Sequence, residues 1–171
     1  MDRSVPNHQR IHTLEALGHL RKEWRSEGCK VVFTNGVFDL LHRGHVTYLE
    51  EAAALGDALI VGINEDAGVR RLGKGDDRPI VPEEDRAMVV AALRSVDAVV
   101  LFADDTPLNL IVALEPDVLV KGGDYDADST DPTDPRYIVG SSEVKAKGGK
   151  VATIALVPGR STTSIASKLK G

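Results

Sequence analysis

The stretch "FTNGVFDLLHRGHVTYLEEA" (Phe33–Ala52) decides the fold, because it joins a strand pattern to a helix pattern through a short polar turn. It begins in an apolar, β-branched run and ends in residues with helical spacing. Between them stand two histidines, His42 and His45, on either side of Gly44. These residue types add little to core packing, so their presence at a helix start indicates a ligand site.

The same alternation continues along the chain. Apolar runs that predict buried strands lie at 30–35, 57–64, 96–102, 116–122 and 150–156. Helical stretches lie between them, at 45–56, 82–95, 106–115 and 137–149. Strands that alternate with helices require crossover connections, and fully apolar strands are buried on both faces. We therefore predict an α/β fold with a Rossmann-like five-stranded parallel sheet and helices on both faces.

The N-terminal segment predicts a helix that packs on the flank of this sheet. Apolar residues recur at helical spacing before Gly28, at Ile11, Leu14, Leu17, Leu20 and Trp24. We predict two parts, an N-terminal flanking helix over 1–29 and a nucleotide-handling domain over 30–171. Two charged, glycine- and proline-rich segments, 70–82 and 122–136, break the alternation and are predicted to be loops with a functional role or no order.

Composition restricts the class of protein. The chain has 171 residues, of which 42% are hydrophobic and 27% charged, as in ordinary globular domains. A net charge of −5 argues against broad nucleic-acid binding, and no apolar run is long enough to cross a membrane. Cys29 is the single cysteine, and the first residues lack a secretory signal pattern. We therefore expect a cytoplasmic protein.

The turn in the opening stretch has the properties of a phosphate site. In an open parallel sheet, ligands bind beyond the carboxyl ends of the strands, where the strand order reverses. The start of a helix offers unpaired N–H groups and a partial positive charge. Gly44 lets an anion approach the backbone, and two histidines three residues apart reach the same anion.

Three motifs carry a family resemblance. The "HRGH" at His42–His45 is an HxGH motif, "LVKGGDY" stands at 119–125, and "GRSTTSI" stands at Gly159–Ile165. In this order the motifs resemble the nucleotidyltransferase superfamily, and within it the heptose 1-phosphate adenylyltransferase domain of lipopolysaccharide-core biosynthesis. The resemblance runs from about residue 30 to 169, and the chain is similar to the stand-alone form of that domain. It departs from the pattern in a longer acidic insert around 126–135.

The resemblance implies the transfer of AMP from ATP to a sugar 1-phosphate, D-glycero-beta-D-manno-heptose 1-phosphate, with release of pyrophosphate. It implies catalytic roles for His42, His45 and Lys74, with Arg71 as a second candidate cation. Acceptor contacts are implied for Asp39, Lys121, Gly123 and Asp124. ATP contacts are implied for Thr34, Asn35, Gly36, Phe38, Gly44, Arg86, Gly159, Ser161, Thr162 and Thr163. Mg²⁺ is implied as a companion of ATP, with Asp39 as the nearest acidic candidate and no ligand assigned. A homodimer is implied as well.

Several alternatives stay open at this stage. Arg86 could pair with an acidic neighbour, Asp39 could form a turn, and Lys74 and Arg71 could be solvated loop charges. The same chemistry could act on CTP and a small alcohol phosphate such as glycerol 3-phosphate. A dinucleotide-binding oxidoreductase is disfavoured, because no G-x-G-x-x-G follows the first strand. A non-catalytic nucleotide sensor would bind ATP without releasing pyrophosphate.

Overall fold

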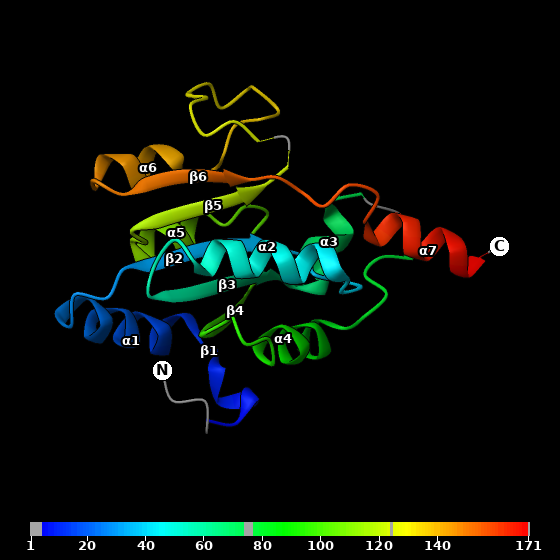
Figure 1. Cartoon of the computed structure of the whole chain (residues 1–171), viewed down its shortest axis with the longest axis horizontal. Coiled ribbons are helices and arrows are strands. Elements are labelled where there is room, and N and C mark those ends of the chain that lie inside the picture. Colours follow the sequence, from blue (N-terminus) through cyan, green and yellow to red (C-terminus); the bar gives the residue numbers. More distant parts are fainter. Residues whose placement is uncertain (1–4, 74–76, 124, 171) are drawn as a thin grey trace.

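The computed structural model describes residues 5–73, 77–123 and 125–170 (Figure 1). Its centre is a parallel sheet of six strands in the order β1-β4-β3-β2-β5-β6. The predicted α/β architecture is confirmed, with one strand more than expected. The strands are β1 (Ile11–His12), β2 (Val31–Gly36), β3 (Ala58–Asn64), β4 (Ala98–Phe102), β5 (Val118–Gly122) and β6 (Lys150–Ile154).

The helices cover both faces of the sheet, as predicted. One face carries α2 and α4, and the other carries α1, α5 and α6. After the short helix η1 (Asn7–Arg10), the helices are α1 (Leu14–Ser26), α2 (Arg43–Ala53), α3 (Asp66–Arg71), α4 (Glu83–Ala91), α5 (Leu108–Leu114), α6 (Ser141–Ala146) and α7 (Thr162–Lys170). Figure 1 shows α7 projecting beyond the ends of the strands. Among the described residues, no helix has both the length and the apolar character needed to cross a bilayer.

The core is divided into two layers by the alternation of side chains along each strand. On β2, Val32 packs in the cluster with α2 and α4, whereas Val31 and Phe33 pack in the cluster with α1. Successive side chains of a strand point to opposite faces, so an apolar run with few polar residues serves both layers. Burying both faces in this way is the main stabilising contribution of the sheet.

The sixth strand comes from the N-terminal segment. Ile11 and His12 were predicted to begin a helix, but they form β1, which pairs with Val99 and Val100 of β4. The prediction is wrong for these two residues. Ile11 shares the helical spacing of the apolar residues after it, and that spacing extended the predicted helix too far toward the N-terminus. The helix starts only after Thr13, whose side chain caps it by accepting a hydrogen bond from the backbone N–H of Ala16 at 3.2 Å.

Two loop boundaries also differ from the prediction. The segment 70–82 begins inside α3, a helix that the sequence analysis did not place. The helix predicted over 137–149 is restricted to α6. Gly140 is the N-cap of α6 and has a φ of 87°, a conformation that glycine adopts readily and that separates the helix from the turn before it.

The strand order reverses beside β2. The chain builds β2, β3 and β4 outward in one direction and then returns to place β5 on the other side of β2. In open parallel sheets this reversal leaves a crevice at the carboxyl ends of the two central strands. The ends of β2 and β5 therefore mark where a ligand site is expected.

Candidate active site

A cavity of about 610 Å³ opens at this reversal point. Asn35 and Gly36, at the end of β2, and Lys121 and Gly122, at the end of β5, line its floor. Lys121 Nζ donates a hydrogen bond to Asn35 Oδ1, so the two strand ends are joined across the crevice. The cavity has the size of a small-molecule site and carries a positive charge at its base.

The starts of α2 and α7 meet at this cavity. Gly44 of α2 and Ser161 and Thr162 at the start of α7 line the same space. A Cβ atom built on Gly44 would lie 3.5 Å from the Cβ of Arg160, which shows how closely the two segments approach. The N-terminal ends of two helices, with their partial positive charge, therefore border one space, which suits an anion.

The histidine pair is a stacked unit at the start of α2. His42 caps the helix, because its Nδ1 accepts a hydrogen bond from the backbone N–H of Gly44 at 3.1 Å. An accepting Nδ1 carries no proton, so the neutral ring of His42 has its proton on Nε2. The His42 and His45 rings stack with centroids 4.0 Å apart, and Phe38 lies 5.4 Å from His45. Both histidines line the cavity.

Both histidines are neutral donors at neutral pH rather than permanent cations. Burial, and then the neighbouring His42, lowers the pKa of His45 to about 4. Burial, and then the charge of Arg160, lowers the pKa of His42. His45 Nδ1 is buried and has no hydrogen-bond partner among the described residues. A neutral imidazole can still donate a hydrogen bond to an anion, and the fixed positive charge of the cavity comes from Arg160 and Lys121.

The lowered pKa of His45 predicts how stability depends on pH. The unfolded chain takes up a proton near the ordinary pKa of 6.5, whereas the folded chain does so only near 4. The free energy of unfolding therefore falls as the pH is lowered from about 6.5 to about 4. Between pH 7.5 and pH 5 we expect His45 to account for a loss of about 1 kcal/mol, since solvent around a half-buried ring reduces the full value of about 1.4 kcal/mol per pKa unit.

This contribution can be measured by urea unfolding of the wild type and of His45→Gln at both pH values. Glutamine does not titrate, so the variant is expected to lose less stability between them than the wild type. Equal losses in the two proteins would contradict the assignment.

Several predicted residues lie around the cavity without facing it. Thr34 is fully buried, and its Oγ1 lies 2.7 Å from the hydroxyl of Tyr48, which itself lines the cavity. Gly123 and Gly159 have φ values of 77° and 70° and lie outside the lining. Thr163 faces a smaller adjoining cavity of about 460 Å³. Lys74 and Asp124 lie outside the described residues.

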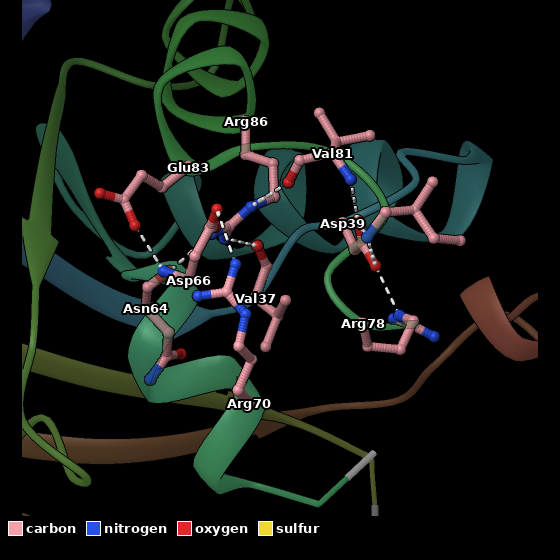
Figure 2. A network of polar contacts seen from close by, with 10 residues as sticks. Val37, Asp39, Asn64, Asp66, Arg70, Arg78, Val81, Glu83 and Arg86 are labelled. Carbon is pink, nitrogen blue, oxygen red and sulfur yellow. Dashed lines mark hydrogen bonds and ion pairs between the residues drawn. The ribbon is translucent and has the colours of Figure 1, made fainter. Parts of the chain in front are cut away.

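The structure does not bring Arg86 or Asp39 into the main cavity. Arg86 is 1% exposed and donates to backbone carbonyls and to Asp66 Oδ1, at 2.6 Å (Figure 2). Asp39 is 4% exposed, and its Oδ1 accepts hydrogen bonds from the backbone N–H groups of Ile80 and Val81, which lie in the segment after α3. The pairing of Arg86 with an acidic neighbour and the turn role of Asp39 are therefore the alternatives that these contacts support. Arg71 pairs with Asp105 at 2.6 Å.

Some of the residues that line the cavity were not among the predicted site residues. Arg160 stands inside the quoted "GRSTTSI" motif, where a cation before a helix start was a readable signal. Tyr125 ends the quoted "LVKGGDY" motif, and Tyr137 directly follows the segment 122–136. Lys121 Nζ lies 5.6 Å from the ring centroid of Tyr125. Nothing in local spacing indicated that the ring of Tyr137 reaches the site.

Comparison with known proteins places this site in a family. The cytidylyltransferase-like family model matches residues 33–168. "Bifunctional protein HldE" of Methylobacillus flagellatus is 51% identical over 166 residues, which are 97% of this chain and 32% of that protein. The protein of the same name from Magnetococcus marinus is 55% identical over 146 residues, 85% of this chain and 28% of that one. The chain thus spans about a third of the length of these curated relatives.

Two solved structures share the fold. The lipopolysaccharide core biosynthesis protein of Thermoplasma volcanium superposes with a TM-score of 0.57 at 28% identity, covering 76% of this chain and 98% of that one. The pantoate-beta-alanine ligase of Francisella tularensis has a TM-score of 0.57 at 14% identity, covering 94% of this chain and 76% of that one, which is a likeness of fold alone. Because the family model matches most of its length, including both helix starts at the cavity, the chain belongs to the cytidylyltransferase-like (nucleotidyltransferase) family.

Proposed function

We propose that the chain is an adenylyltransferase that transfers AMP from ATP to D-glycero-beta-D-manno-heptose 1-phosphate, giving ADP-heptose and pyrophosphate. The observation that carries the proposal is the shared cavity of Gly44, Arg160 and Ser161, which suits a triphosphate held between two helix starts. The motifs at 119–125 and 159–165 support the heptose acceptor, and so does the likeness to a lipopolysaccharide core biosynthesis protein.

In the proposed reaction, an oxygen of the sugar 1-phosphate attacks the α-phosphorus of ATP. The bond from that phosphorus to the bridging oxygen of the β-phosphate breaks, and pyrophosphate leaves with the electron pair. Such transfers depend on in-line positioning and on stabilisation of charge more than on a protein nucleophile. His42 Nε2–H and the His45 ring donate hydrogen bonds to phosphate oxygens as negative charge builds up.

The second helix start binds the leaving group in this scheme. Ser161 Oγ accepts from the backbone N–H of Ser164 at 3.1 Å, which caps α7. The N–H group of Thr162, which begins α7 and lines the cavity, then stays available to the β- and γ-phosphates. Lys121, joined to Asn35 at the cavity floor, is proposed to bind the phosphate of the acceptor.

We propose that Mg²⁺ enters with ATP and neutralises part of its charge. Among the described residues, no cluster of three or more His, Cys, Asp or Glu side chains is suited to a metal. Asp105 is the acidic residue in the described cavity lining, and Arg71 pairs with it. A metal coordinated chiefly by triphosphate oxygens and water fits this lining, because Mg²⁺ commonly takes only one or two protein carboxylates.

The second candidate is a cytidylyltransferase that acts on CTP and glycerol 3-phosphate, which the name of the family favours. Incubating the protein with ATP or CTP and with either acceptor, and measuring pyrophosphate, separates the two. Release that needs ATP and the heptose phosphate together supports the adenylyltransferase. Release with CTP and glycerol 3-phosphate alone would replace it with the second candidate, and nucleotide binding without release would indicate a sensor. A homodimer remains part of the proposal on family likeness, and a cytoplasmic location on the single cysteine.

Arg160→Ala is expected to raise KM for ATP about tenfold, because a charge-assisted hydrogen bond to phosphate contributes about 1.5–3 kcal/mol before solvent screening. The pKa of His42 is expected to rise in this variant, since Arg160 helps to lower it. Arg43→Ala is the matched control. Arg43 is the arginine of the "HRGH" motif, but its side chain is exposed and outside the cavity lining. An equal change in KM for both variants would argue against a specific phosphate contact by Arg160.

A further inference from the structure

The backbone of Phe38 has a conformation that a bulky residue rarely adopts. Its φ is 50°, and the residue is 6% exposed. A positive φ at a residue with a large side chain persists only where the surrounding contacts hold it, and such positions concentrate at functional sites. The ring lies 5.4 Å from that of His45 at an interplanar angle of 59°. The unusual backbone therefore places an aromatic ring against one of the two proposed catalytic histidines.

Arg86 holds the chain on the N-terminal side of Phe38. Its Nη1 donates to the carbonyl of Val37 at 2.6 Å, and this carbonyl belongs to the peptide group that leads into Phe38. Its Nε donates to the carbonyl of Val81 at 2.9 Å. The Arg86 side chain is 0% exposed, so neither bond competes with water. Arg86 thus ties the turn after β2 to the segment that leads into α4.

Asp39 holds the chain on the C-terminal side of Phe38. Its Oδ1 accepts from the backbone N–H groups of Ile80 at 2.9 Å and Val81 at 2.8 Å. Its Oδ2 accepts from Arg78 Nε at 2.5 Å, and the Asp39 side chain is 1% exposed. Val81 is bound from both sides, because its N–H donates to Asp39 and its carbonyl accepts from Arg86 (Figure 2).

The far end of the Arg86 guanidinium is anchored on β3 and α3. Nη2 donates to the carbonyl of Asn64 at 2.9 Å and to Asp66 Oδ1 at 2.6 Å. Asp66 is fixed in turn, because its backbone N–H donates to Glu83 Oε2 at 2.5 Å (Figure 2). All three nitrogens of the guanidinium therefore bind the protein itself. This arrangement is suited to fixing backbone rather than to binding a substrate phosphate.

We infer that Arg86 and Asp39 are positioning residues that hold the backbone on either side of Phe38, so that the Phe38 ring fixes His45 against His42 at the cavity. The inference rests on the proposed function for its catalytic consequence, whereas its structural part concerns this chain alone. A loosened turn would let the His45 ring move, and a displacement of about 1 Å at a reacting centre can lower a rate about 10²-fold.

The test compares Arg86→Lys with Arg21→Lys. Lysine keeps the charge but cannot reach the separate acceptors that a guanidinium binds. Arg21 is a matched control, because it is also buried and donates to two backbone carbonyls and to Asp117, at the opposite end of the strands. Two quantities are measured: kcat and KM for both substrates, and the ring proton resonances of His45 by NMR without substrate.

Arg86→Lys is expected to lower kcat by about 10- to 100-fold, to change KM for ATP less than about threefold, and to shift the His45 resonances as the Phe38 ring current is lost. Arg21→Lys is expected to lower the melting temperature about as much as Arg86→Lys does, but to leave kcat and the His45 resonances unchanged. If Arg86→Lys does not fold, the same measurements on Asp39→Asn decide. Unchanged His45 resonances in a folded variant would overturn the inference even if no substrate were turned over, which separates its failure from that of the proposed function.

Discussion

Replacing His45 with alanine is expected to lower kcat by about 10²- to 10³-fold while KM for ATP changes less than about threefold. The reason is that the ring is neutral and half-buried, so it interacts weakly with the ground-state triphosphate and more strongly as charge develops in the transition state. In the proposed scheme, Arg160 and the helix starts instead meet the charge of ATP in the ground state. Steady-state kinetics at saturating and limiting ATP separates the two parameters.

The control for this prediction is His19→Ala. His19 is an exposed residue of α1, on the part of the chain that flanks the sheet, and its loss should leave kcat unchanged. A His45→Ala protein that keeps wild-type kcat would remove His45 from the mechanism. A variant that loses ATP binding as much as kcat would assign the ring to ground-state binding instead.

Much of the fold was readable because the strands of a parallel sheet are nearly pure apolar runs. The run at 57–64 became β3, whose residues are all buried, and its neighbours on the sheet followed the same pattern. The two-residue strand β1 has too few residues to show a period of its own, and Ile11 fits the helical spacing of α1 equally well. Its place in the sheet depends on pairing with β4, which only the tertiary structure supplies.

The site was readable where its residues are close in sequence and unreadable where they are not. His42, Gly44 and His45 lie on one helix turn, so spacing alone placed them together. Arg86 has the residue type of a phosphate ligand, and only its burial against three carbonyls and a carboxylate shows that its donors are used internally. Burial and partners at long sequence separation are properties of the fold, which no local pattern contains.

Replacing Gly44 with alanine is expected to lower kcat/KM for ATP by at least about 100-fold while the protein stays as stable as the wild type. A Cβ built on Gly44 would lie 2.9 Å from Cε1 and 3.0 Å from Nδ1 of His42, so the ring of His42 must move. The methyl group would also occupy space between His42 and Arg160, where phosphate oxygens are proposed to lie. A misplacement of about 1 Å at such a centre costs about 10²-fold in rate.

Gly44→Ala is expected to lose activity but not stability, so a loss of activity can be assigned to the site rather than to unfolding. Gly44 lies within α2, where alanine is favoured over glycine by about 0.5–1 kcal/mol, which offsets the lost cap of His42. Gly18→Ala is the matched control, because Gly18 lies within α1 and a Cβ there would meet no atom within 4 Å. It should gain about 0.5–1 kcal/mol in the free energy of unfolding and keep full activity. If Gly44→Ala also kept full activity, no phosphate could lie against the start of α2, and the proposed use of the cavity would be wrong.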